Sequence, residues 1–245
     1  MRATTAKLKH PSVAEAVCEF RFSKGVSYTM VAGAMWERLR KRFPKSEVLP
    51  TASLLASIPD EAMMPQVPHH RFRSERPNAL VQTGPRLLTI NVLPVYPTFE
   101  VFRRLILDVL KHYQAVAEPG NPVRVGLRYI NHIQSGHLGE SLDDYLNFSL
   151  TYPNGLPHPP QEVSARVTLP FGDLGNLGFA VAFPARSAAG ESGALLDLDF
   201  SWSEPGEFDL KRFPLWLDKA HQIIYTAFTS TVVEEIMNRM RGERS

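Results

Sequence analysis

The sequence lacks the features that mark several large classes of protein. It has one cysteine, Cys18, which excludes an internal disulfide framework and a metal cluster built from cysteines alone. No stretch approaches the roughly 18 consecutive apolar residues of a membrane helix, and the N-terminus lacks the apolar core of a signal peptide. The net charge of +2 is too small to indicate binding to nucleic acid or to a membrane. We therefore expect a cytoplasmic protein without a membrane partner.

The composition that remains is that of a folded globular chain. Of the 245 residues, 44% are hydrophobic and 21% are charged. The charge is uneven, because residues 1–122 carry a net +7 and residues 123–245 a net −5. We expect two α+β lobes, 1–122 and 123–245, packed as one compact unit with their opposite charges facing each other at the interface.

Hydrophobic periodicity predicts a similar order of elements in both halves. In the first half, strands are expected at 13–22, 54–58, 70–75, 79–84 and 86–93, and helices at 29–43 and 99–117, the second capped by Thr98. In the second half, strands are expected at 123–134, 163–170, 176–184 and 193–202, with a short helix at 139–149 and a long helix from about 215 to 240. A glycine-rich segment, 172–178, is expected to be a hairpin turn.

This order predicts an α+β fold with an internal duplication. Each half runs strand, helix, several strands, long helix, so we expect a curved antiparallel sheet with helices on one face. The order resembles the strand–helix–four strands–helix unit of the TATA-binding-protein-like fold. The phenylalanine wedges and basic surface that DNA binding by that fold needs are not in this sequence.

Five phrases, spread in order along the chain, carry a second resemblance. They are PSVAEAVCEFRF (11–22), RFRSERPNALVQTGPRLLTINVLPVYPTFEVF (71–102), VGLRYINHI (125–133), LLDLDF (195–200) and WLDKAHQIIYTAF (216–228). As an ordered set they resemble a sporadically distributed, functionally uncharacterised family of bacterial proteins of about 250 residues. Such a sparse distribution implies mobile or defence-related genes, for example antitoxins or accessory defence proteins. The resemblance supplies no catalytic residues.

Paired carboxylates form the first candidate site. Asp197 and Asp199 lie two apart on an expected strand, so their side chains share one face. Paired carboxylates can bind Mg²⁺ or divide acid and base roles. We favour ion pairing with neighbouring strands instead, where Glu19, Arg21 and Arg128 are available, because no further ligand stands at metal spacing. We therefore expect neither a metal nor a cofactor.

A second cluster, Arg128 with Tyr129 and Asn131, is the densest polar group in the strand expected at 123–134. Arginine and asparagine side chains could bind a phosphate, a carboxylate or a base edge. The alternative is a cross-strand ladder whose polar groups satisfy one another. Alternation along the strand places Arg128 on one face and Tyr129 and Asn131 on the other, which argues against a single site.

Arg71 and Arg73, on either side of Phe72, resemble a strand that contacts single-stranded nucleic acid. Further basic residues of the same half could extend a patch: Arg38, Lys41, Arg42 and Arg86. We favour contact between these arginines and the acidic second half instead, because the total charge is close to neutral.

Nucleophilic catalysis has little support. Asp218 and His221 share a helix face, which suits a local ion pair or a cap better than a triad, because the sequence has no GxSxG motif and Cys18 occupies an apolar strand position. We expect a non-enzymatic binding protein that recognises another protein, in a bacterial defence or toxin–antitoxin context, through an open sheet face. The alternative is a nucleic-acid or nucleotide-binding protein that uses the same face, and a homodimer is compatible with either.

Overall fold

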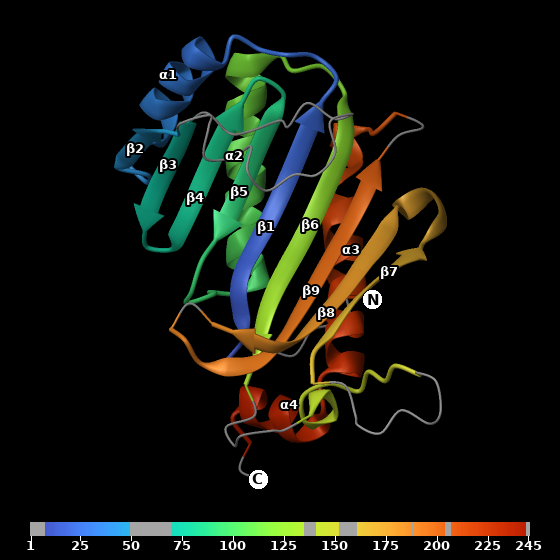
Figure 1. Cartoon of the computed structure of the whole chain (residues 1–245). Helices are drawn as coiled ribbons and strands as arrows, with labels where there is room; N and C mark the ends of the chain where they lie inside the picture. Colours follow the sequence, from blue (N-terminus) through green and yellow to red (C-terminus); the bar gives the residue numbers. More distant parts are fainter. Residues whose placement is uncertain are drawn as a thin grey trace.

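Nine strands and four helices make up the regular structure of the residues that the computed structural model describes, which are 8–49, 70–134, 141–151, 161–187, 189–203 and 207–243. All nine strands join one antiparallel sheet in the order β2-β3-β4-β5-β1-β6-β9-β8-β7 (Figure 1). The strands are β1 (Val13–Phe22), β2 (Lys45–Val48), β3 (His70–Glu75), β4 (Asn78–Gly84), β5 (Leu87–Val92), β6 (Pro122–Ile133), β7 (Val163–Pro170), β8 (Asn176–Arg186) and β9 (Ser192–Ser203). The helices are α1 (Tyr28–Leu39), α2 (Phe99–Ala117), α3 (Phe213–Thr231) and α4 (Glu234–Arg241).

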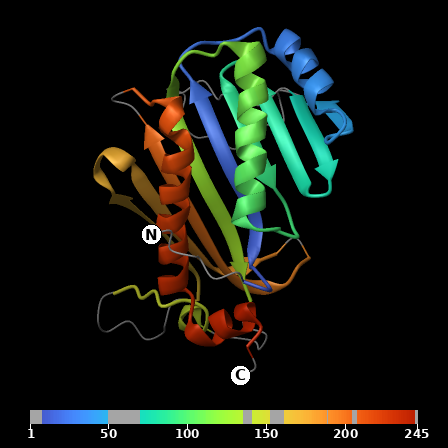
Figure 2. The same ribbon diagram turned by 180° about the vertical axis from the view of Figure 1, so that it is seen from behind.

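The helices form one layer against one face of the sheet. Figure 2 shows α2 and α3 lying side by side along the strands, with α1 beside the β3–β4 end and α4 below the end of α3. On the opposite face, which Figure 1 presents to the viewer, no helix of the described residues covers the strands. The expected α+β class with an antiparallel sheet is therefore confirmed.

Alternation along β1 and β6 produces the two unlike faces. In β1 the side chains of Cys18, Phe20 and Phe22 are fully buried beneath the helices, while Glu19 and Arg21 point to the open face. Apolar and polar residues at a spacing of two are sorted in this way by the pleat of a strand. The core consequently lies between the sheet and α1, α2 and α3.

Local sequence fixes the ends of α2. Thr98 has extended backbone, and its hydroxyl accepts a hydrogen bond of 3.3 Å from the amide of Val101, as the sequence predicts. At the other end Glu118 has a φ of 44°, a left-handed conformation, and Pro119 follows it, so the helix cannot continue. This helix is important below because its first turn borders a cavity.

The C-terminal helix expected to run to residue 240 is instead two helices. At Val232 and Val233 the backbone becomes extended, and Val232 forms an isolated bridge with Leu146. The amide of Val233 donates to the carbonyl of Tyr145, and that of Asn147 donates to the carbonyl of Thr231. Pairing with this distant segment replaces the helical hydrogen bonds, and two adjacent β-branched residues favour the extended form.

Two other expectations differ from the structure, and one strand was not expected. The helix expected at 139–149 shrinks, within its described part, to a three-residue 3₁₀ turn at Leu142–Asp144. The helix expected to reach residue 43 ends at Leu39. Strand β2 was not predicted, because all four of its residues are exposed and its sequence shows no apolar alternation. The other expected strands in the described residues are confirmed with ends that move by at most two residues, and the strand expected at 54–58 lies outside them.

The sheet is continuous between the two halves of the chain. The first strands of the two halves, β1 and β6, pair with each other at the centre of the sheet. On its outer side each of them pairs with the last strand of its own half, β1 with β5 and β6 with β9. The expected hairpin turn between β7 and β8 is present but shorter, because the link is residues 171–175, with a short 3₁₀ turn, and residues 176–178 already pair with β7. None of the helices within the described ranges is long and apolar enough to cross a membrane.

Candidate functional site

The central strands carry a row of ion pairs on the open face. Arg124 of β6 lies between two carboxylates, with 2.6 Å from its Nη1 to Oε1 of Glu19 and 2.8 Å from its Nη2 to Oδ2 of Asp199. Glu19 also accepts a hydrogen bond of 2.8 Å from Nε of Arg21. Three strands, β1, β6 and β9, are therefore connected through charged side chains as well as through their backbones.

Gly126 makes this arrangement possible because it has no side chain. In the register of the sheet it lies between Glu19 and Ser201, two residues along the strand from Arg124 and on the same face. A β-carbon at this position would approach Nη1 of Arg124 to 2.6 Å. The guanidinium therefore occupies the space above the glycine, and from there it reaches both carboxylates.

Arg128 and Asp197 form a second, bidentate pair beside this row. Nε of Arg128 donates to Oδ1 of Asp197 over 2.8 Å, and its Nη2 donates to Oδ2 over 2.6 Å. These hydrogen bonds are the main reason that the pKa of Arg128 is raised. We refer to the whole set as the charged ladder, and its members are Glu19, Arg21, Arg124, Arg128, Asp197 and Asp199.

A network of amide and charged side chains continues the pattern toward the outer strand β2. Arg71 donates to Oε1 of Gln82 over 3.2 Å and to Oε1 of Glu47 over 3.1 Å. Gln82 donates to Asn91 over 3.3 Å, and Asn91 donates to Glu15 over 2.6 Å. The expected contact between Arg71 and the acidic second half is therefore wrong, because all these partners belong to the first half.

The structure brings most, but not all, of the predicted site residues to one face. The expectation that the two aspartates form ion pairs is confirmed, although Arg124, a partner of Asp199, was missed. Arg71 and the exposed Arg73 share the open face with them, on β3. Asn131 faces the helices instead, where it is 2% exposed and donates to the carbonyl of Leu196 over 3.2 Å.

The basic patch considered around Arg71 does not form as expected. Arg38 lies on α1, and Lys41 and Arg42 follow it, on the covered side of the sheet. Arg42 pairs there with Asp108 of α2 at 3.5 Å. A metal centre has no support within the described part of the chain either, since no three His, Cys, Asp or Glu side chains are grouped to hold an ion.

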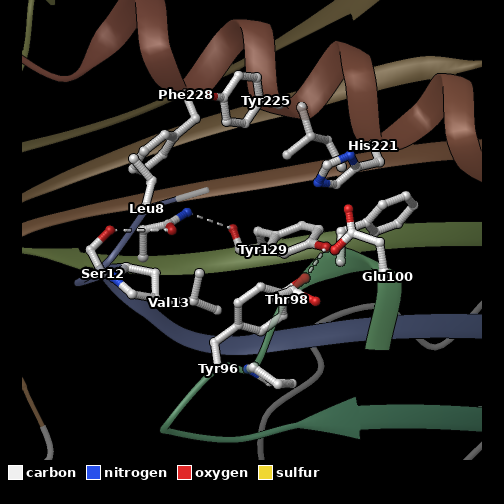
Figure 3. Close-up of a pocket in the computed structure, with 15 residues that line it drawn as sticks. Leu8, Ser12, Val13, Tyr96, Thr98, Glu100, Tyr129, His221, Tyr225 and Phe228 are labelled. Atoms are coloured by element: carbon white, nitrogen blue, oxygen red, sulfur yellow. Dashed lines mark hydrogen bonds between the residues drawn. The ribbon is translucent and has the colours of Figure 1, made fainter. Parts of the chain in front are cut away.

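A cavity of about 350 Å³ opens on the covered side, between α2, α3 and the beginning of β1 (Figure 3). A register shift in β1 contributes to its wall, because Val13 pairs with Asn131 whereas Glu15 pairs with Ile130. One extra residue on β1 turns Val13 to the covered face, where it lines the cavity. Six rings dominate the lining, and they belong to Tyr96, Phe99, Tyr129, His221, Tyr225 and Phe228.

Two tyrosine hydroxyls meet in the wall of this cavity. The oxygens of Tyr96 and Tyr129 are 2.8 Å apart, and either can donate the proton. Burial is the main cause that raises the pKa of both phenols, and the nearby charge of Glu100 raises them further. Both tyrosines are therefore protonated at neutral pH, so the pair retains one hydroxyl proton that the bond between them does not use.

His221 of α3 contributes a neutral ring. It stacks on Phe99 with a centroid separation of 3.6 Å and an interplanar angle of 4°. Desolvation lowers its pKa to about 4, despite the opposing effects of Glu100 and Asp218. The expected local ion pair between Asp218 and His221 is wrong, because Asp218 accepts two hydrogen bonds from Arg103 of α2.

Sequence reasoning missed the cavity, although several of its residues had been noticed for other reasons. Tyr129 was grouped with Arg128, and His221 was paired with Asp218. The available signal was that Tyr129 and His221 are amphipathic residues placed on faces that pack inward, where their polar atoms need partners. The partner Tyr96 comes from the loop before α2, and its position cannot be read from periodicity.

Comparison with models of known protein families gives no match for this chain, and comparison with curated proteins gives none either.

Proposed function

We propose that this protein is a non-enzymatic binding protein that holds a small molecule in the aromatic cavity. The observation that supports this is the cavity itself, which combines an apolar lining with a few convergent polar groups. Small-molecule sites in proteins usually have this composition and a volume of at least about 300 Å³.

The protonation states of the polar lining favour binding over catalysis. Burial keeps Tyr96 and Tyr129 protonated and His221 neutral at pH 7, far from the pKa values near 7 that suit a general acid or base. These groups offer fixed hydrogen bonds to a ligand. Cys18, the one thiol, is buried in the core and its pKa is raised well above the ordinary value, so it is a poor nucleophile.

A neutral probe and two matched variants test this proposal. We expect 2-phenylethanol to shift the NMR methyl signals of Ile224 and Val13, which line the cavity. Val13→Phe places a ring in the cavity and should abolish these shifts, whereas Val17→Phe adds the same ring to the open face of the same strand and should not. Equal binding to both variants would locate the probe elsewhere and refute the cavity as its site.

The open face supports a second candidate function, recognition of another protein. On its strands, basic and acidic side chains are nearly balanced: Arg21, Lys45, Arg71, Arg73, Arg124, Arg128 and Arg166 against Glu15, Glu19, Glu47, Glu75, Asp197 and Asp199. A mixed-sign surface complements another protein better than a phosphate backbone, which requires an excess of basic groups. The bacterial defence or antitoxin context stays a prediction that rests on the resemblance of the five phrases.

Two variants separate this candidate from the nucleic-acid alternative. Native mass spectrometry of the protein purified gently from its host should show a stoichiometric protein partner that Arg128→Ala loses and Arg71→Ala retains. Equal losses, or a loss with Arg71→Ala only, would contradict this choice of face. A bound oligonucleotide, released steeply by added salt, would favour the nucleic-acid alternative.

We also propose that the halves 1–122 and 123–245 are two similar lobes derived from one duplicated unit, with the element order of the TATA-binding-protein-like fold. The positions of β1 and β6 at the centre, each flanked by the last strand of its own half, support this. A cytoplasmic location is proposed as well, and the buried, unpaired thiol of Cys18 is compatible with it.

A further inference from the structure

The hydroxyls of Tyr96 and Tyr129, which we call the tyrosine pair, have one more proton than they use. Their oxygens are 2.8 Å apart, so one hydroxyl donates and the other accepts. The proton of the accepting hydroxyl has no acceptor among the described residues, because neither tyrosine makes a further hydrogen bond to them. Since burial raises the pKa of both phenols above the ordinary value, this proton stays on its oxygen at neutral pH.

An unused donor is less common in a buried site than an unused acceptor. An oxygen has two lone pairs and often leaves one without a partner, whereas buried donors are almost always paired. Two other polar residues of the lining follow this rule. Ser12 donates to Oδ1 of Asn131 over 3.4 Å, and Asn131 donates to the backbone carbonyls of Tyr129 and Leu196. The tyrosine pair, in contrast, lacks an acceptor that a ligand can supply.

The tyrosine pair lies at one side of the cavity. Figure 3 shows its two hydroxyls meeting on the side that the ring of His221 also borders, and Leu8 with Phe228 on the other side. His221 is neutral at pH 7, because desolvation lowers its pKa to about 4. These three side chains therefore offer hydrogen bonds and not charge, and a ligand is oriented with its polar end toward them.

The rings of the lining favour a flat ligand. Phe99 and His221 stack on each other with an interplanar angle of 4°, and Tyr129 is tilted by 56° to His221 at a centroid separation of 6.0 Å. Aromatic rings attract each other in both offset-stacked and edge-to-face arrangements. An aromatic body can therefore contact the faces of some lining rings and the edges of others.

We infer that the ligand of this cavity is a small aromatic carbonyl compound whose oxygen accepts a hydrogen bond from the tyrosine pair. The inference rests on the proposed function, since it names the class of ligand that the cavity binds. The bond between the two tyrosines polarises the second hydroxyl and strengthens its bond to the carbonyl. The ring of the ligand lies among Val13, Ile224 and Phe228, which are apolar residues of the lining.

Two probes of the same flat shape test the inference. Acetophenone carries the carbonyl group, and α-methylstyrene has a methylene group in place of the carbonyl oxygen. NMR titrations that follow the methyl signals of Val13 and Ile224 give a dissociation constant for each probe. The ratio of the two constants cancels the apolar contacts that both probes make, so a change in this ratio reports on the oxygen alone.

Variants that keep the rings assign the carbonyl contact to the tyrosine pair. Tyr96→Phe combined with Tyr129→Phe removes both hydroxyls, and we expect it to weaken acetophenone at least about tenfold relative to α-methylstyrene. Tyr113→Phe is the matched control. It removes a buried phenol oxygen that also lacks a partner among the described residues but lies outside the lining, so the ratio should be preserved. Thermal unfolding shows whether each variant is folded.

Infrared difference spectra give a second readout, which needs only the wild-type protein. With acetophenone isotopically labelled at its carbonyl carbon, the stretching band of the bound probe can be separated from the protein bands. A hydrogen bond lowers the frequency of this band. We therefore expect the bound probe to absorb at a lower frequency than the same probe in hexane, and the double variant to shift the band back toward the hexane value.

The possible outcomes separate the inference from the proposed function. If the double variant leaves the ratio intact, or the carbonyl bound to the wild-type protein absorbs as in hexane, the carbonyl ligand is refuted and the small-molecule site stands. If neither probe binds at millimolar concentration, or Val13→Phe leaves their binding unchanged, both are refuted. If the ratio changes as expected and Val13→Phe abolishes the binding of both probes, both are supported.

Discussion

The two faces of the central sheet differ in how their polar side chains are satisfied. On the open face, every member of the charged ladder pairs with another member, and all of them except Arg21 have a partner in a neighbouring strand. On the covered face, the hydroxyls of Tyr96 and Tyr129 and the ring of His221 border a cavity. The first arrangement fixes strands to each other, whereas the second leaves hydrogen-bonding capacity for another molecule.

The largest expected change in stability at neutral pH comes from replacing Arg124 of the charged ladder. Arg124→Met leaves Glu19 and Asp199, which are only about one-fifth exposed, without their shared cation. We expect a loss of about 2–3 kcal/mol in the free energy of unfolding, measured by urea titration. Arg71→Met is the control, because its partner Glu47 is 55% exposed, and it should lose less than about 1 kcal/mol. Equal losses would show that the ladder is no more than a set of solvated surface pairs.

Acid should destabilise the covered face through His221. The unfolded chain protonates His221 near its ordinary pKa of 6.5, whereas the folded protein resists protonation until about pH 4. Between these values the unfolded state binds more protons, so stability falls as the pH falls. We expect His221 to account for a loss of about 3 kcal/mol between pH 7 and pH 4. His221→Phe, which keeps a ring against Phe99, should lose that much less over the same range in urea titrations, and identical pH profiles would contradict the assignment.

The smallest effect compares one residue type on the two faces. Thr83 points to the covered side of β4, and its buried hydroxyl lacks a hydrogen-bond partner among the described residues. Thr89 of β5 points to the open side, where its hydroxyl accepts a hydrogen bond of 3.2 Å from Gln82. Thr83→Val should raise the free energy of unfolding by about 1 kcal/mol, and Thr89→Val should lower it by about 1 kcal/mol. Thermal unfolding of both variants checks the signs, and a common sign would contradict the distinction.

The open face could largely be predicted from the sequence, because a strand has a fixed period. Alternation alone placed Arg128 with Asp197 and Asp199, and it placed Asn131 on the other side. The role of Arg124 could not be predicted, because it depends on the register that brings Gly126 between Glu19 and Ser201. The register depends on how distant segments of the chain pair, and it cannot be derived from a single sequence.

The cavity was inaccessible to the same reasoning. Its rings come from the loop before α2, from α2 itself, from β6 and from α3, and Val13 reaches it only because β1 contains an extra residue. A bulge leaves no periodic signal, and it reverses the face to which the preceding residue points. The α2 cap at Thr98, by contrast, is a local interaction and was predicted correctly.

The cavity also lies across the seam between the two halves of the chain. Tyr96, Phe99 and Glu100 come from the first half, whereas Tyr129 and His221 come from the second. A molecule bound there contacts both, so its binding free energy adds to the cohesion between the halves and to neither half alone. Ligand binding should then make the unfolding of α2 and α3 more concerted, so that their amide hydrogens exchange in a single event.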